Sequence, residues 1–354
     1  MSKDKVRIGL LGVGGIGYAH LGMWTSLPSA EVVAVCDIVP ERADNGAKKG
    51  TENYAQKEVG YKGEIEAYYD LAEMLKKADI DAVDVCTWSG LHAEHGLMAL
   101  QAGKHTLIEK PIDLDLVKID RLIAEADRTK LKVGCIFQSR FGAEIRRAHD
   151  LIKAGKIGKI ISCSVYCKWW RGQDYYDSAS WRGTWALDGG CLANQGVHSI
   201  DQLCWMAGPV AEVEYSHIET AMHKMEAEDF AIAVVRFENG ARGVVEGTTS
   251  AFPGFSTKVE IFGDKGSASF DGSRVLSFQV VGEEIDLTTK EEKAGDGRAD
   301  PLAIGLGGHA AQLSEFANCV LYDEQPYVNA REARIAVDCL NKIYKKAGVA
   351  KIGT

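Results

Sequence analysis

A run of glycines near the start of the chain directly follows a stretch that is typical of a β-strand. Residues 6–12 are rich in aliphatic side chains and lead into Gly12-Val13-Gly14-Gly15-Ile16-Gly17, which has the spacing G-x-G-x-x-G. In such a turn the first glycine permits a tight bend, the second lets the backbone approach a ligand, and the third lets the next helix pack closely on the strand. The motif therefore restricts this part of the chain to a strand, a sharp turn and a helix.

An acidic residue ends the second strand-like stretch. Asp37 lies twenty residues beyond Gly17, where a carboxylate can accept hydrogen bonds from the ribose hydroxyls of a dinucleotide. A carboxylate repels the ribose phosphate of NADP, and Ile38 and Val39 offer no cation, so that Arg42 is the nearest one. The pattern predicts NAD rather than NADP. The alternatives are FAD, S-adenosylmethionine, or a glycine turn with only a structural role.

The first 137 residues alternate strand-like runs with helical periodicity, as parallel α/β units do. Strands are expected at 6–12, 31–37, 81–87, 104–110 and 132–137. Helices are expected at 15–27, 40–49, 70–77, 91–102 and 114–129. We therefore expect residues 1–137 to form a Rossmann domain, in which right-handed crossovers join the strands of one parallel sheet.

After Phe137 the rhythm changes, which predicts a second domain over residues 138–354. Long stretches of alternating apolar and polar residues are separated by turns such as Asn239-Gly240. Helices are expected at 142–154, 308–322 and 330–348. The polar segment 276–306 is expected to hold a strand pair followed by a mobile loop. This half is predicted to be an α+β domain with a large, open, mostly antiparallel sheet, whose C-terminal helix can pack back on the first domain.

The size and charge of the chain limit the classes of protein to which it can belong. Its 354 residues exceed the roughly 250 residues at which single cores stop growing, so two domains are expected. The formal net charge of −9 disfavours nucleic acid as a partner, because phosphate binding depends on clustered Lys and Arg. No apolar run long enough to span a membrane and no export signal are present, so a soluble, cytoplasmic protein without a membrane partner is expected.

The nine cysteines are an odd number and lie mostly inside apolar runs. They indicate small buried side chains in a reducing compartment. The closest pair, Cys163 and Cys167, has neither Cys-x-x-Cys spacing nor a histidine at zinc spacing. No metal site is predicted.

Two segments carry candidates for chemistry. Glu109-Lys110-Pro111 ends the fifth strand, at the sheet edge where ligands bind, and a lysine there can stabilise an alkoxide that develops as hydride leaves carbon. Residues 187–201 contain glycines, Asn194 and His198, and a histidine near the start of a helix suits a general base. The plain alternatives are a surface lysine beside a proline turn, a buried histidine that satisfies a hydrogen bond, and an asparagine that caps the helix.

Together these segments resemble the Gfo/Idh/MocA family, named for glucose-fructose oxidoreductase and inositol dehydrogenase. The resemblance covers most of the chain. It rests on the glycine motif, Thr87 to His92, Ala102 to His105, the Glu-Lys-Pro, and Gly189 to Asp201, in that order. It implies a Rossmann domain joined to an α/β domain with a large open sheet, a tightly held NAD or NADP, and homodimers or homotetramers formed through that sheet.

The resemblance also implies roles for single residues. The family's catalytic lysine and histidine correspond to Lys110 and His198. Many members carry an aspartate four residues before the histidine, but this chain has Asn194, which orients a hydroxyl without exchanging a proton near neutral pH. Asn194 is therefore assigned to substrate binding, as in members that oxidise C3 of a pyranose or a nucleotide-linked sugar. The expected cofactor contacts are Gly12, Gly14, Gly15, Ile16, Gly17, Asp37, Thr87, Trp88, His92, Glu109, Lys110 and Gln138.

Two aromatic features remain. Trp88 stands where relatives often have proline, and its ring either walls the nicotinamide pocket or fills space. The segment 169–185 is unusually aromatic; aromatic faces stack on the C–H surfaces of sugars, and an arginine can donate two parallel hydrogen bonds. We hypothesise that Arg182, Trp181 and Tyr176 line the substrate pocket. The alternative is that these aromatic residues pack a domain or subunit interface.

The sequence thus predicts an NAD-dependent dehydrogenase that transfers hydride between the nicotinamide and a secondary hydroxyl of a sugar, sugar acid or cyclitol. Lys110 and His198 are the expected acid–base pair, and a small carbohydrate or cyclitol is the expected partner. One alternative is an NAD-dependent glycoside hydrolase or lyase that oxidises C3 transiently. Another is a cofactor-binding regulator without turnover, since fold does not dictate function.

Overall fold

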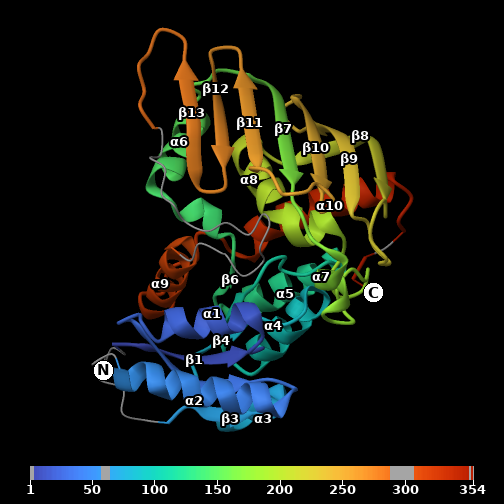
Figure 1. Cartoon of the computed structure of the whole chain (residues 1–354). Coiled ribbons are helices and arrows are strands. Elements are labelled where there is room, and N and C mark those ends of the chain that lie inside the picture. The colour runs from blue at the N-terminus through green and yellow to red at the C-terminus, as the bar shows by residue number, and fades with distance from the viewer. Residues whose placement is uncertain (1–3, 57–63, 288–306, 351, 354) are drawn as a thin grey trace. The chain divides into compact units, whose positions relative to one another are not determined.

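The computed structural model describes residues 4–56, 64–287, 307–350 and 352–353. The chain divides into two compact units, the first made of Met1–Ile136 with His309–Ala333 and the second of Phe137–Gly308 with Arg334–Thr354. Each unit has its own sheet (Figure 1). Within the described ranges, no helix combines the length and the apolar character that crossing a membrane requires.

The first unit is built on a six-stranded parallel sheet with the order β3-β2-β1-β4-β5-β6 (Figure 1). The strands are β1 (Val6–Leu11), β2 (Ala30–Cys36), β3 (Glu66–Tyr68), β4 (Ala82–Val85), β5 (His105–Ile108) and β6 (Val133–Cys135). The helices are α1 (Gly15–Trp24), α2 (Pro40–Gln56), α3 (Leu71–Lys77), α4 (His92–Gln101), α5 (Leu116–Thr129) and α9 (Gly307–Leu321). This is the strand order of a Rossmann fold, in which the reversal between β1 and β4 opens a crevice at the carboxyl ends of the strands.

Local sequence explains most of these elements. All four residues of β4 are buried, as expected for a strand covered on both faces. Asp70 and Asp115 cap α3 and α5 by accepting hydrogen bonds from the backbone N–H groups of Glu73 and Val117. The expectation of five strands missed β3, because only Tyr68 of its three residues is buried and so no alternating pattern can be seen.

The second unit contains a seven-stranded sheet with the order β13-β12-β11-β7-β10-β9-β8 (Figure 1). Its strands are β7 (Ile160–Lys168), β8 (Val210–Glu219), β9 (Phe230–Phe237), β10 (Arg242–Thr248), β11 (Lys258–Gly263), β12 (Gly266–Asp271) and β13 (Arg274–Val280). Five neighbouring pairs are antiparallel, and only β7 and β10 run parallel. This confirms the prediction of an α/β protein with a second, mostly antiparallel sheet.

Helices cover one face of this sheet, since α8 packs against β7 and β11, and α6 packs against β13. The helices of the unit are α6 (Ala143–Lys153), α7 (Gln173–Asp177), α8 (Val197–Ala207) and most of α10 (Ala330–Lys346). Burial alternates along β9, where every second side chain is buried, as the sequence pattern predicted. Of the predicted strand pair and loop at 276–306, β13 forms the beginning, and residues 288–306 lie outside the described residues.

Candidate active site

The glycine turn after β1 has space for glycine alone at two positions. Gly12 has φ +88°, and a Cβ there would lie 2.6 Å from the backbone oxygen of Cys86. A Cβ on Gly17 would lie 1.9 Å from the backbone oxygen of Gly12. Both clashes are with backbone, which cannot move aside as a side chain can. Gly12 therefore makes the bend, and Gly17 lets α1 lie close to the turn.

The middle of the same turn is open. A Cβ on Gly14 or Gly15 would have no atom within 4 Å. Gly14 is the N-cap of α1, no side chain caps the helix there, and its first turn holds no acidic residue. The backbone N–H groups at a helix start carry partial positive charge and bind phosphate. The open turn therefore fits the pyrophosphate of a dinucleotide, with Gly14, Gly15 and Ile16 as the residues that would hold it.

The carboxylate of Asp37, just after β2, is hydrogen-bonded to the backbone of the glycine turn. One carboxylate oxygen accepts a hydrogen bond from Val13 N at 2.8 Å, and the other accepts one from Val39 N at 2.9 Å. The residue is only 6% exposed. Each carboxylate oxygen has two lone-pair sites, so both retain acceptor capacity for ribose hydroxyls. The position fits the role that the sequence analysis expected for it.

The predicted cofactor contacts after β4 include His92, which also contacts the Glu-Lys-Pro segment. The buried ring of His92 lies with Nδ1 2.7 Å from the oxygen of Pro111 and with Nε2 3.0 Å from the oxygen of Thr87. The hydroxyl of Thr87 lies 2.9 Å from Nδ1 of His95. Trp88 is half-buried at the start of the next 3₁₀ turn. His92 thus connects two loops at the carboxyl edge of the sheet. Its contact with the cofactor stays a prediction.

Glu109 and Lys110 follow β5 directly. Glu109 is 4% exposed, and its Oε2 accepts a hydrogen bond from the backbone N–H of Lys110 at 2.9 Å. The Lys110-Pro111 peptide is cis. Lys110 itself is half-buried. The structure therefore places the predicted catalytic lysine at the carboxyl end of the sheet, with its backbone held by the preceding carboxylate.

In the second unit, Asn194 and His198 share one face of a continuous helical segment. A π-helical turn, Leu192–Gly196, leads into α8, which ends at Ala207, before Gly208 as expected. Between Cys191 and Ala207, every residue except Asn194 and His198 is buried. Residues four apart lie on the same side of a helix. The two predicted site residues are therefore the only residues of this segment that are partly exposed.

Asn194 is held by an anchor that the sequence analysis did not identify. Its side-chain N–H₂ donates a hydrogen bond to one carboxylate oxygen of Asp188, which is 2% exposed. The other oxygen of Asp188 accepts a hydrogen bond from the backbone N–H of Gly183 at 2.7 Å. Gly183 has φ +67°, which favours glycine. Asp188 thus fastens the aromatic segment to the helix that carries Asn194.

The aromatic segment places its two tyrosines differently. The guanidinium of Arg182 lies 4.0 Å from the ring centre of Tyr175 and 4.7 Å from that of Trp181. The hydroxyl of Tyr175 accepts a hydrogen bond from the side chain of Gln195 at 3.3 Å. Tyr176 is 6% exposed, and its hydroxyl lies 2.7 Å from that of Thr249. Tyr175, which was not among the candidates, therefore connects Arg182 to the helical segment, while Tyr176 packs inside the unit.

Two further side chains belong to this region. Gln138, a predicted cofactor contact, opens the 3₁₀ turn after β6, and its buried Oε1 has no hydrogen-bond partner among the described residues. A buried acceptor without a partner is costly, and a ligand amide or hydroxyl could satisfy it. The ring of His198 meets that of Phe137 edge to face, with 6.1 Å between the ring centres. The imidazole of His198 is therefore packed against the ring of Phe137.

A buried acid lies beneath the glycines that precede Asn194. A Cβ on Gly190 would lie 1.2 Å from Oε2 of Glu228, so only glycine fits above this carboxyl group. Oε1 of Glu228 accepts hydrogen bonds from Leu192 N at 3.0 Å and from the hydroxyl of Tyr344 at 2.8 Å. Burial disfavours the charged form and raises the pKa of Glu228 to about 7. The carboxyl group that supports the segment carrying Asn194 and His198 is therefore expected to titrate near neutral pH.

This raised pKa predicts how stability depends on pH. Because folded Glu228 keeps its proton up to about pH 7, its favourable contribution is present below its usual pKa of 4.5 and is lost as the pH rises through 7. The loss is on the order of 3 kcal/mol, at 1.36 kcal/mol for each pKa unit. Glu228→Gln is expected to remove this loss, so its melting temperature exceeds that of the wild type above pH 7 and the gap closes toward pH 4.5. The exposed Glu238→Gln is the matched control; parallel pH profiles of the Glu228 variant and the wild type would contradict the expectation.

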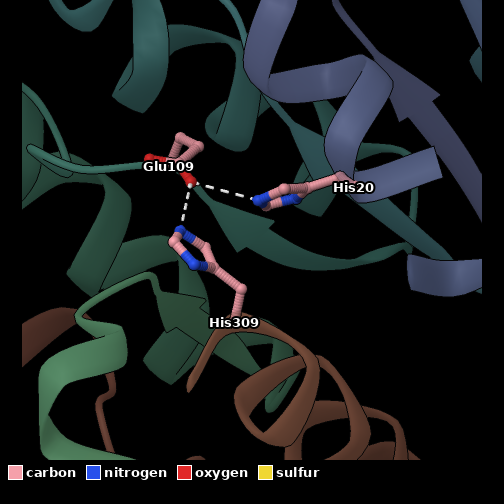
Figure 2. A group of neighbouring side chains, drawn as sticks. All are labelled: His20, Glu109 and His309. Atoms are coloured by element: carbon pink, nitrogen blue, oxygen red, sulfur yellow. Dashed lines mark hydrogen bonds and ion pairs between the residues drawn. The ribbon is translucent and has the colours of Figure 1, made fainter. Parts of the chain in front are cut away.

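The first unit also holds a buried cluster of ionisable side chains that the sequence analysis missed. Two groups have potential ligand atoms within 4.8 Å of one another: His20, Glu109 and His309, and His20, Asp84 and Cys86. Figure 2 shows the first group, in which His20 and His309 both point toward Glu109. In the described residues, the ring of His20 already engages two carboxylates, since Nδ1 lies 2.8 Å from Asp84 and Nε2 lies 3.1 Å from Glu109. Both ring nitrogens of His20, at the centre of the cluster, are thus engaged directly by carboxylates.

Comparison with known proteins agrees with this geometry. Residues 6–137 match the model of the oxidoreductase family with an NAD-binding Rossmann fold, and residues 145–269 match the model of the GFO/IDH/MocA C-terminal domain. The myo-inositol 2-dehydrogenase of Thermotoga maritima is 26% identical over 288 residues, which are 79% of this chain and 80% of that protein. A glycosyl hydrolase family 109 protein of Bacteroides thetaiotaomicron is 35% identical over 127 residues, which are 36% of this chain and 27% of that protein.

Among solved structures, the WlbA dehydrogenase of Bordetella pertussis, in complex with NADH and UDP-GlcNAcA, is similar over nearly the whole chain. The TM-score is 0.81 at 29% identity, and the match covers 97% of this chain and 96% of that one. The family matches confirm the resemblance that the motifs indicated. The chain belongs to the Gfo/Idh/MocA family of oxidoreductases, and its first part is an NAD-binding Rossmann domain.

Proposed function

We propose that this chain is an NAD-dependent dehydrogenase that oxidises a secondary hydroxyl of a sugar, sugar acid or cyclitol. The observation that carries the proposal is the helical segment Cys191–Ala207, which buries every side chain except Asn194 and His198. A histidine left accessible beside a hydrogen-bonding amide is the arrangement that a general base needs. The names of the relatives support the substrate class, because they include a myo-inositol 2-dehydrogenase and a dehydrogenase in complex with a nucleotide sugar.

In the proposed mechanism, His198 takes the proton of the substrate hydroxyl. Lys110 donates a hydrogen bond to the same oxygen and stabilises the negative charge that develops on it. Asn194 orients a neighbouring hydroxyl. Bound NAD supplies the acceptor for the hydride. Oxidation removes one hydride and one proton from the carbinol, so a ketone, the reduced cofactor and a proton on His198 account for all atoms and electrons.

The test is a panel of free sugars, sugar acids and cyclitols incubated with purified protein and NAD. Net formation of reduced nicotinamide, followed by absorbance, is the expected result for at least one compound. The same panel with NADP checks the cofactor, because the carboxylate of Asp37 should exclude the ribose phosphate. A protein that binds NAD but reduces it with no member of the panel would contradict the proposal.

A second candidate is hydrolysis or elimination of a glycoside through transient oxidation at C3. The 127-residue match to a glycosyl hydrolase family 109 protein favours it. In this reaction the hydride returns to the sugar, so an aryl glycoside releases its phenol without net formation of NADH. Net NADH from a free sugar supports the dehydrogenase, and phenol release without net NADH supports the hydrolase.

A cytoplasmic homo-oligomer is part of the proposal. All nine cysteines are free and buried, which agrees with a reducing compartment. Size-exclusion chromatography with light scattering would measure the number of subunits, and a monomer at micromolar concentration would contradict this part.

Arg182 offers a test of the substrate pocket. Its guanidinium is stacked on Tyr175 and Trp181, which holds its donors in a fixed plane. Arg182→Ala is expected to raise the KM for the sugar or cyclitol by roughly tenfold or more, which corresponds to about 1.4 kcal/mol, and to leave the KM for NAD unchanged. Arg182→Lys should recover only part of the loss, because lysine lacks the planar pair of donors. With the exposed Arg128→Ala as control, an unchanged substrate KM would remove Arg182 from the pocket.

A further inference from the structure

Three buried side chains form one hydrogen-bonded chain that ends at the catalytic lysine. Asp84 on β4, His20 on α1 and Glu109 after β5 are 1%, 0% and 4% exposed. Asp84 accepts a hydrogen bond from Trp24 Nε1 at 2.6 Å and lies 2.8 Å from His20 Nδ1. His20 Nε2 lies 3.1 Å from Oε1 of Glu109. Figure 2 marks this interaction with a dashed line. Oε2 of Glu109 then accepts the hydrogen bond from Lys110 N.

The groups around His20 favour the charged form of its imidazole. Burial disfavours its charge, but Cys86 and Asp84 beside it outweigh burial and raise the pKa of His20 well above its usual value. Burial likewise opposes the charge on Glu109, yet the hydrogen bond and charge of His20 hold the pKa of this carboxyl well below its usual range. A positively charged ring can donate from both nitrogens, one to each carboxylate.

His309 has a different state. It comes from α9, and its Nε2 lies 3.9 Å from Oε1 of Glu109, beyond hydrogen-bond distance. Burial lowers the pKa of His309 to about 4, so its ring is neutral at physiological pH. The charged and titratable groups that face His20 are therefore Asp84 and Cys86 from β4, Glu109 after β5, and a neutral His309 from α9.

We propose that His20 is a positioning residue for Lys110. It holds the carboxylate of Glu109 from one side, and Glu109 holds the backbone N–H of Lys110 from the other. Because His20 lies on the helix that begins at the glycine turn, the same helix carries the pyrophosphate site at its start and the support of the lysine in its interior. The proposal depends on the catalytic role of Lys110 in the proposed function.

A matched pair of substitutions separates positioning from packing. Glutamine places its amide near the position of the imidazole Nε2, whereas asparagine reaches only the position of Nδ1. His20→Gln therefore keeps a donor toward Glu109, and His20→Asn keeps one toward Asp84. Relative to the Gln variant, the Asn variant is expected to lower kcat by about 10- to 100-fold, the range that a small misplacement costs, while the Kd for NAD stays within a few-fold. Equal kcat values in the two variants, or a loss confined to melting temperature and NAD affinity, would overturn the proposal.

A measurement on the wild-type protein does not depend on activity. NMR of protein with ¹⁵N-labelled histidine rings, with His20→Gln to assign the signal, is expected to show both nitrogens of His20 protonated at pH 8. In Glu109→Gln, the ring is expected to lose this proton at lower pH. A neutral His20 at pH 8, or one equivalent of a transition metal that disappears in His20→Gln, would overturn the proposal. If no substrate is turned over but the NMR result holds, the proposed function fails while the hydrogen-bonded chain stands.

Discussion

Replacing His198 or Lys110 by alanine is expected to lower kcat by about 10²- to 10⁴-fold, the range that acid–base groups usually contribute. His198 is accessible on a segment whose other residues, apart from Asn194, are buried. Lys110 stands at the carboxyl edge of the parallel sheet, where its ammonium can stabilise an alkoxide. Steady-state kinetics on the substrate found in the panel measure kcat, and quenching of protein fluorescence measures the Kd for NAD.

The controls are the exposed residues His217 and Lys153, replaced by alanine in the same way. We expect these two variants to retain the wild-type kcat and melting temperature. The Kd for NAD should change little in His198→Ala, because the glycine turn and Asp37, the residues expected to bind the cofactor, belong to the other unit. Retention of more than about half of the wild-type kcat in either catalytic variant would contradict the acid–base assignment.

A glycine series along α1 is expected to separate cofactor binding from folding. In Gly17→Ala the new Cβ would lie 1.9 Å from the backbone oxygen of Gly12, so the turn must shift. We expect a loss of stability of about 1–3 kcal/mol or more, as for other overpacked sites, together with loss of NAD binding. In Gly14→Ala the Cβ meets no protein atom within 4 Å, so stability should be retained while NAD binds at least about tenfold more weakly.

Gly22 provides the matched control, since it lies on the same helix and its added Cβ also meets nothing within 4 Å. Gly22→Ala should leave the Kd for NAD unchanged and stabilise the helix by up to about 1 kcal/mol. Thermal unfolding and NAD titration of the three variants check the series. Full NAD affinity in Gly14→Ala would show that the pyrophosphate does not lie over the turn.

The fold could be predicted in large part because three strands of the first unit end at recognisable residues. Gly12, Asp37 and Glu109 mark the carboxyl ends of β1, β2 and β5, and the sheet brings these ends to one edge. The strand β3 was missed because three residues with a single buried side chain give no periodic signal. The π-helical turn before α8 was also missed, since such turns are rare and occur mostly as single turns inside α-helices.

The buried chain of His20, Asp84 and Glu109 could not be predicted, because its members are distant in sequence. Asp84 lies 64 residues and Glu109 lies 89 residues beyond His20. A signal was nevertheless present. His20 and Asp84 each interrupt an apolar run, and a polar side chain in a buried position needs a partner. The choice between Tyr175 and Tyr176 was equally hidden, since neighbouring residues point in different directions and only the structure shows that Tyr176 is the buried one.

The helical segment 191–207 and the aromatic segment 169–185 differ in how many of their side chains are exposed. This difference determines where the enzyme can accept substitutions. On the helix, only Asn194 and His198 are partly exposed, and both belong to the proposed active site. The aromatic segment has many partly exposed side chains and is attached to the helix mainly through Asp188 and Tyr175. If the aromatic segment lines the substrate pocket as proposed, new substrate preferences can evolve by replacing its residues, while the proposed proton-transfer residue His198 on the helix stays unchanged. Libraries for engineering altered substrate choice belong there, with the two attachment residues left in place.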